Sequence, residues 1–303
     1  MALRFQHHPG LVVYLTAGDA GLSPSTPSHS NGAGAGLVDL SASREIALAA
    51  IDAGADVIEL GVPFSDPLAD GPVIQRASER ALARGTRLKD VLGLAGELRN
   101  ARPEAGLVIF TYLNPILRFG LAKFADAAAE AGVDGVLITD MIVEEAAEYL
   151  AEMERVKLAP IFLAAPTSPD ERLRAIAAHS KGFLYAVSRT GITGKQQNVA
   201  ADAVALVARI RRFTDHQDGH KDGHEDGPGD EADWRGLPIA VGFGISNADH
   251  VTEVAKFADA AVIGSAIVDL IERTALDRGE EQVPGAVAQF IEGLRQPQTV
   301  QAL

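Results

Sequence analysis

Eight short apolar segments, separated by longer amphipathic ones, constrain the fold of this 303-residue chain more than any other feature. Each is rich in Val, Ile, Leu or Ala, and most are closed by Gly, Pro, Asn or Asp, which is the pattern of a buried strand. The predicted strands are residues 11–15, 57–60, 107–113, 135–139, 158–164, 183–187, 238–241 and 260–263. The predicted helices are residues 41–53, 73–84, 88–100, 121–131, 144–155, 169–179, 199–213, 247–257, 266–276 and 283–294.

Strands that alternate with helices pair in parallel, with both faces of the sheet covered. Eight such strands over about 250 core residues predict a (β/α)₈ TIM barrel, an α/β fold, built as a single domain over residues 1–303. The alternative is a doubly wound open sheet, which places a G-x-G-x-x-G turn after its first strand. The segment here is Thr16-Ala17-Gly18-Asp19, so the barrel is favoured.

Two tracts interrupt the alternation. Residues 20–40, after the first strand, are rich in Gly, Ser, Pro and Ala with almost no charge, and we expect a flexible insertion. Residues 215–236, before the seventh strand, are acidic and His-rich, and we expect a disordered insertion. His216, His220 and His224 could line one face of a helix and bind a metal, but four glycines and a proline oppose that helix, so no metal site is predicted.

Charge and composition exclude several classes of function. The formal net charge is −14, with 41 acidic against 27 basic residues, which argues against a nucleic-acid or anionic-membrane surface. The chain has no cysteine, so it has neither disulfides nor thiolate chemistry. No apolar stretch reaches the ~18 residues of a membrane span, and the N-terminus lacks a signal-peptide layout. These features predict a cytoplasmic protein.

The second predicted strand ends in an acid. The side-chain period of two puts Val57 and Glu59 on one face and Ile58 and Leu60 on the other. The following loop carries three prolines, which restrict its conformations, and a further acid, Asp70. An acid at a strand end followed by such a loop could form one side of an active site. The alternative is an ordinary strand end followed by a turn that contains Asp and Pro.

Barrel enzymes work at the carboxyl ends of their strands. At the last two of these ends, Gly242-Phe243-Gly244 and Gly264-Ser265 each precede a helix. Backbone N–H groups at such positions bind phosphate, and the loops after strands seven and eight are the usual phosphate site of this fold. The alternative is that the glycines merely end the strands. Two consecutive occurrences favour a phosphorylated substrate.

Glu59 and Asp70 then suggest acid–base chemistry on that substrate. Lys195 is the nearest candidate for a Schiff-base lysine, but it lies in a loop rather than on a strand. A His-rich metal site at the strand ends is also absent from the sequence. Proton transfer without a cofactor in this chain is therefore expected.

Several motifs resemble the tryptophan synthase α subunit family, whose fold is a ribulose-phosphate-binding barrel. The longest is ELGVPFSDPLADGP at residues 59–72, and the resemblance covers nearly the whole chain apart from the two tracts. The shorter ones are LTAGD at 15–19, YLNP at 112–115, SRTGITG at 188–194, VGFGIS at 241–246 and GSA at 264–266.

The resemblance implies a lyase of tryptophan biosynthesis that cleaves indole-3-glycerol phosphate into indole and glyceraldehyde 3-phosphate by a retro-aldol reaction. It implies a β subunit as partner in an α₂β₂ complex, which receives the indole and carries pyridoxal phosphate. Asp70 would take the indole N–H proton, and Glu59 would move the proton to and from C3 and the glycerol hydroxyl. Burial would raise the pKa of Glu59, while a more open loop would leave Asp70 ionised.

The resemblance assigns further residues to the site. Tyr112 would contact substrate, Tyr185 would stand beside Glu59, Thr193 would hydrogen-bond Asp70, and Asp140 would face the partner subunit. The phosphate would be held by Gly194, Phe243, Gly244, Gly264 and Ser265. The N-terminus lacks the leading helix of many relatives, which would leave the base of the barrel less covered.

Two other functions stay open from the residues alone. A free-standing indole-3-glycerol phosphate lyase, which releases indole, would share the same site. A non-catalytic regulatory barrel that binds phosphate would be expected to lack Glu59 or Asp70, and both are present.

Overall fold

The computed structural model describes residues 3–22, 38–187, 196–214, 236–242 and 244–295. Residues 23–37 of the first predicted insertion and 215–235 of the second lie outside the described residues. In the described residues the strands are β1 (Gly10–Thr16), β2 (Val57–Gly61), β3 (Gly106–Thr111), β4 (Gly135–Ile138), β5 (Ala159–Ile161), β6 (Leu163–Ala164), β7 (Leu184–Val187), β8 (Ile239–Gly242) and β9 (Ala260–Ile263).

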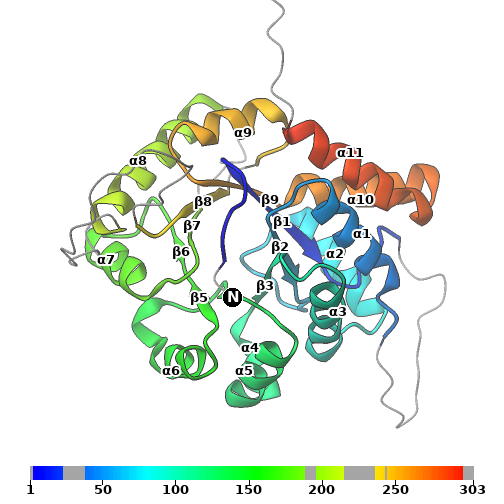
Figure 1. Ribbon diagram of the computed structural model, residues 1–303, viewed down its shortest axis with the longest axis horizontal. Coiled ribbons are helices and arrows are strands. Elements are labelled where there is room, and N and C mark those ends of the chain that lie inside the picture. The colour runs from blue at the N-terminus through cyan, green and yellow to red at the C-terminus, as the bar shows by residue number, and fades with distance from the viewer. Residues whose placement is uncertain (1–2, 23–37, 188–195, 215–235, 243, 296–303) are drawn as a thin grey trace, which may run out of the picture.

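The helices lie outside the ring of strands, as Figure 1 shows. They are α1 (Ser41–Asp52), α2 (Pro72–Ala83), α3 (Leu88–Ala101), α4 (Leu113–Phe119), α5 (Leu121–Glu130), α6 (Ala147–Val156), α7 (Asp170–His179), α8 (Gln196–Thr214), α9 (Ala248–Ala255), α10 (Ser265–Arg278) and α11 (Val283–Arg295), with short 3₁₀ turns at Val143–Glu145 and Glu280–Gln282.

Every strand pairing is parallel, and the strand order is β5-β4-β3-β2-β1-β9-β8-β7-β6. The two ends of this order, β5 and β6, are halves of the one segment predicted at residues 158–164. The first half pairs with β4 and the second with β7, so this segment closes the ring. The predicted barrel is confirmed, with its fifth strand divided at Phe162 because each half hydrogen-bonds to a different neighbour.

One prediction about the third strand is wrong. Residues 107–113 were expected to be extended up to Asn114-Pro115, but β3 ends at Thr111 and α4 begins at Leu113. Pro115 falls in the first turn of that helix, where backbone N–H groups have no intrahelical acceptor, so proline is tolerated there.

Two apolar layers hold the barrel together. The outer layer packs the helices on the outward strand faces, whereas the inner layer fills the ring itself. Leu3 and Phe5 belong to the inner layer although they precede β1, and each is less than a tenth exposed. Burying such a side chain contributes roughly 1.5–3 kcal/mol. Leu3 and Phe5 thus cover part of the base of the barrel.

Candidate active site

Glu59 lies inside the barrel, near the carboxyl end of β2. Val57 belongs to the inner apolar layer and Ile58 and Leu60 to the outer one, so the predicted alternation places Glu59 inward. In register it stands between Tyr14 of β1 and a valine of β3. Its side chain is completely buried, and neither carboxyl oxygen has a hydrogen-bond partner among the described residues.

This environment sets the protonation state of Glu59. Burial raises the pKa of its carboxyl from 4.5 to about 8, because the ionised form loses its hydration. At pH 7 the group is mainly protonated. Glu59 is therefore suited to donate a proton to a bound molecule.

Asp70 ends the loop that follows β2. The Tyr112 hydroxyl donates a hydrogen bond to its Oδ2 at 2.9 Å and accepts one from the Ala69 N–H at 3.0 Å. Burial raises the pKa of Asp70 to about 6, and the bond from Tyr112 opposes that rise. Asp70 is thus mainly ionised at pH 7, although it is more buried than its loop suggested. At pH 7 Glu59 is therefore mainly protonated and Asp70 mainly anionic, as the sequence predicted.

Tyr185 and Tyr14 complete the polar lining. Burial raises the pKa of Tyr185 well above its usual value, and the negative charges of Glu59 and Asp70 add to this effect. The pKa of Tyr14 is raised by burial and then by the charge of Asp70. Both phenols are therefore neutral hydrogen-bond donors at physiological pH.

Glycines on the neighbouring strands make room for these two tyrosines. A Cβ atom built at Gly61 would lie 2.3 Å from the Tyr14 hydroxyl oxygen, and one at Gly242 would lie 2.7 Å from that of Tyr185. Any larger residue at either position would displace a phenol. Sequence reasoning missed Tyr14, although it shares the inward face of β1 with Val12 and its alternation could have revealed it.

The residues predicted to bind phosphate lie where the sequence placed them, as far as they are described. Gly264 is the N-cap residue of α10 and Ser265 its first residue, and Ser265 is exposed. Gly244 follows β8 with φ of 52°, a left-handed conformation that favours glycine. Because β8 and β9 are neighbours, the two segments lie at adjacent strand ends. Thr193, Gly194 and Phe243 lie outside the described residues.

Asp140, the predicted partner-facing residue, is exposed after β4. Its Oδ1 accepts a hydrogen bond from the Leu113 N–H at 2.7 Å, at the first residue of α4. A carboxylate at a helix N-terminus satisfies a free donor and complements the helix dipole. Asp140 therefore holds α4 against the loop after β4.

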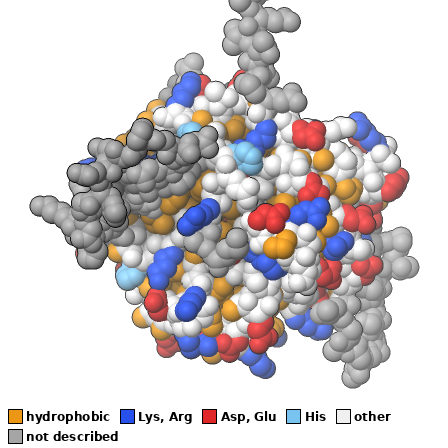
Figure 2. Space-filling view, viewed as in Figure 1, with side chains coloured by type: hydrophobic (Ala, Val, Ile, Leu, Met, Phe, Trp, Pro, Cys, Tyr) orange, Lys and Arg blue, Asp and Glu red, His pale blue; other side chains and the backbone are white. Residues whose placement is uncertain are grey.

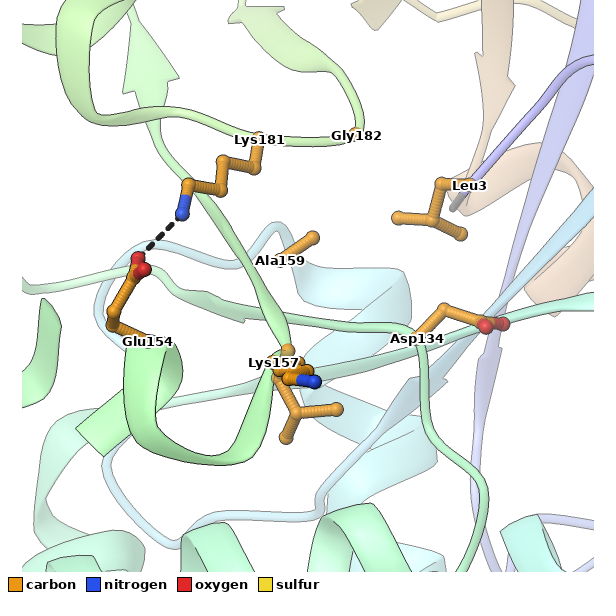
Figure 3. A pocket seen from close by; sticks show the side chains of 8 residues that line it. Leu3, Asp134, Glu154, Lys157, Ala159, Lys181 and Gly182 are labelled. Carbon is orange, nitrogen blue, oxygen red and sulfur yellow. Dashed lines mark hydrogen bonds and ion pairs between the residues drawn. The ribbon is translucent and has the colours of Figure 1, made fainter. Parts of the chain in front are cut away.

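A cavity of about 340 Å³ lies at the opposite end of the barrel, near the start of β5 (Figure 3). Lys181 pairs with Glu154 at 2.6 Å on one side of it, while Leu3 and Asp134 approach from the other. These residues belong to the amino ends of the strands, remote from Glu59 and Asp70. The cavity is thus no part of the candidate site.

Other classes of site find little support in the described residues. They contain no cluster of three or more His, Cys, Asp or Glu that could hold a metal ion. None of their helices is long and apolar enough to cross a membrane. On the face seen in Figure 2, basic and acidic side chains are intermixed rather than gathered into one basic patch.

The family model described as tryptophan synthase alpha chain matches residues 33–218 and 232–296. This chain belongs to the tryptophan synthase alpha chain family, a family of lyases. The alpha chain of Solibacter usitatus is 45% identical over 273 residues, 90% of this chain and 87% of that relative. The alpha chain of Geobacter sulfurreducens is 41% identical over 295 residues, 97% and 95% of the two chains.

Solved structures of the family share the fold. The tryptophan synthase subunit alpha of Legionella pneumophila is 31% identical, with a TM-score of 0.74 over 95% of this chain and 91% of that one. A chain from the Pyrococcus furiosus tryptophan synthase complex is also 31% identical, with a TM-score of 0.72 over 94% and 97%.

Proposed function

We propose that this chain cleaves indole-3-glycerol phosphate into indole and glyceraldehyde 3-phosphate, in the tryptophan biosynthesis of the cytoplasm, and passes the indole to a β subunit. One observation carries the proposal. In a member of this family, a fully buried Glu59, which has a pKa of about 8 and no hydrogen-bond partner among the described residues, lies at the same end of the barrel as Asp70, whose pKa is about 6.

The two carboxyl groups suit the two halves of the reaction. Protonated Glu59 donates its proton to C3 of the indole ring, and ionised Asp70 accepts the N–H proton, so that C3 becomes tetrahedral. Glu59, now a carboxylate, removes the proton of the glycerol hydroxyl next to C3. The carbon–carbon bond breaks, its electrons restore the indole ring, and Asp70 returns the proton to nitrogen. Each acid–base role is typically worth ~10²–10⁴-fold in rate.

The surrounding groups would bind the substrate and keep both acids in these states. Tyr112 stabilises the anionic form of Asp70 through its hydrogen bond. The segments at Gly244 and at Gly264 and Ser265 supply backbone donors for the phosphate, together with Gly194 and Phe243. Thr193 is proposed to bond Asp70, and Tyr185 to stand beside Glu59. The chemistry consists of proton transfers, so we propose no cofactor in this chain and pyridoxal phosphate only in the β subunit.

The proposed partner surface lies at the same end of the barrel. Leu68, Leu117 and Ile142 follow β2, β3 and β4 in turn, and are 94%, 59% and 43% exposed. Their positions after consecutive strands place three large apolar side chains at one end of the barrel, where they could contribute to a contact surface. Asp140 stands two residues from Ile142. We propose that this surface binds the β subunit in an α₂β₂ assembly.

Release of indole from indole-3-glycerol phosphate tests the activity, with and without a β subunit. We expect slow turnover alone and strong activation by the β subunit. Equal and high activity in both assays would instead indicate a free-standing lyase, and no activity in either would reject the proposed reaction.

A variant tests the phosphate site separately. In Gly244→Asp a carboxylate would face the phosphate from a left-handed backbone position, so binding of glycerol 3-phosphate should be lost. Unchanged affinity, measured by calorimetry, would place the phosphate elsewhere.

A further inference from the structure

A buried ion-pair network joins three elements that meet beside the candidate site. Arg80 of α2 donates from Nε and Nη2 to the two carboxylate oxygens of Asp19, at 2.8 Å each. Its remaining Nη1 donates to Glu272 of α10 at 2.6 Å. The side chains of Arg80, Asp19 and Glu272 are only 8%, 2% and 16% exposed. Arg80 therefore ties α2 both to the loop after β1 and to α10, and Arg76 of α2 adds a more exposed pair with Glu272 at 2.7 Å.

Each helix in this network begins at a different half of the candidate site. Helix α2 begins at Pro72, two residues after Asp70, whereas α10 begins at Ser265, in the proposed phosphate site. A seven-residue separation places Glu272 about 10 Å, or two turns, along α10 from Ser265. The ion pairs thus connect the two halves through rigid helices rather than through loops.

Two contacts in the first turns of α2 extend the connection. The Gln75 side chain donates from Nε2 to the Asp70 carbonyl oxygen at 2.9 Å, so α2 holds the backbone of the acid itself. A Cβ atom built at Gly264 would lie 4.0 Å from the Ile74 side chain, an ordinary van der Waals distance. The N-cap residue of α10 therefore lies close to the first turn of α2.

We propose that Arg80 is a positioning residue that couples the phosphate-binding end of α10 to the loop carrying Asp70. Phosphate seated at Ser265 holds α10, Arg80 transmits that position to α2, and Gln75 holds Asp70 for the reaction. Guanidinium suits this task because its planar fork engages one carboxylate with two donors and still reaches another. The inference rests on the proposed phosphate site.

Hydrogen exchange of the amides in residues 62–71 tests the coupling, with glycerol 3-phosphate as the probe. In the wild-type chain, saturating probe should slow this exchange at least about fivefold, the lower end of ordinary coupling between sites. In Glu272→Leu, which leaves the Arg80–Asp19 pair in place but removes the pairs of Glu272 with both Arg80 and Arg76, the slowing should disappear while the probe still binds. In Glu272→Gln, which retains an acceptor oxygen, the slowing should return.

Arg76→Met is the matched control, because it removes the more exposed pair between α2 and Glu272 and leaves the buried Arg80–Glu272 pair in place. It should keep the full slowing. Arg80→Lys keeps the charge but lacks the fork, so it should lose the slowing and lower kcat more than it raises KM. Equal slowing in wild type and Glu272→Leu, or none in a wild-type chain that binds the probe, would overturn the coupling. A wild-type chain that does not bind the probe would instead refute the phosphate site.

Discussion

Asp56 and Glu59 lie three residues apart, toward opposite ends of strand β2, and differ in their hydrogen-bond partners. Both side chains are completely buried. The carboxylate of Asp56 accepts backbone bonds from Gln6 and Leu11 and pairs with Arg295. The carboxyl of Glu59 has no hydrogen-bond partner among the described residues. The first acid is used for structure, and the second is left available for chemistry.

The bonding pattern of Asp56 is repeated around the base of the barrel. Asp134 and Asp259 also stand one residue before a strand, β4 and β9. Each accepts a backbone bond from the strand before, at Leu107 and at Ile239, and each pairs with an arginine. A buried carboxylate stabilises a fold only when donors replace its lost water. These acids join neighbouring strands at the base and so stabilise the barrel. The opposite end can then carry a group such as Glu59, whose hydrogen-bonding atoms have no partner among the described residues.

The largest effect should come from Glu59→Gln, which removes the proton donor without changing shape. We expect kcat to fall by ~10²–10⁴-fold while glycerol 3-phosphate still binds. Steady-state indole release and calorimetry measure the two quantities. Normal turnover would show that the buried carboxyl is not the catalytic acid.

The same variant should become more stable. The raised pKa of Glu59 means that its ionisation opposes folding: the penalty is absent below pH 4.5 and grows as the pH rises to about 8. Glu59→Gln removes it, so the gain should be near zero at pH 4.5 and on the order of 4 kcal/mol at pH 8. Urea unfolding at both pH values measures this, and an equal gain at both would contradict the sign.

Asp56→Asn should show the reverse pattern, with stability lost and chemistry kept. It leaves the partly buried Arg295 without its anion, and removing one partner of such a pair costs about 3 kcal/mol. The kcat of the folded fraction should stay near the wild-type value. Asp52→Asn, which breaks an exposed pair with Arg102, is the control and should cost far less. Similar losses in both variants would remove the distinction between buried and exposed acids.

Tyr112→Phe should have the smallest effect and refine the role of Asp70. In the wild type, kcat/KM should rise as the pH passes about 6, where Asp70 ionises, and fall as it passes about 8, where Glu59 ionises. The bond from Tyr112 lowers the pKa of Asp70, so its loss should move the acid limb to higher pH. Activity at pH 6 should fall roughly tenfold. If only the alkaline limb shifted, that limb would have to be assigned to Asp70 and the acid limb to Glu59.

Local patterns determined much of this molecule. The alternation of short apolar segments and helices predicted the barrel, and the period of two on β2 predicted that Glu59 faces inward. Two details went wrong where neighbours override local preference. Residues 158–164 divide because each half pairs with a different strand, and residues 113–119 form a helix whose first turn contains Pro115. Motif resemblance, rather than periodicity, suggested the reaction.

Only the tertiary structure determined the hydrogen-bond partners and the pKa of each acid. The sequence does not distinguish Asp56 from Glu59, because both are acids in the same short segment. In the structure Asp56 bonds to Leu11 and Arg295, whereas Glu59 has no hydrogen-bond partner among the described residues. Tyr112 meets Asp70 across 42 positions, and Arg80 meets Asp19 across 61. The pKa of a carboxyl depends on burial and on donors within a few ångströms. Chain folding sets those distances, so the sequence determined which acids the barrel holds, and the packing around them determined which ones can react.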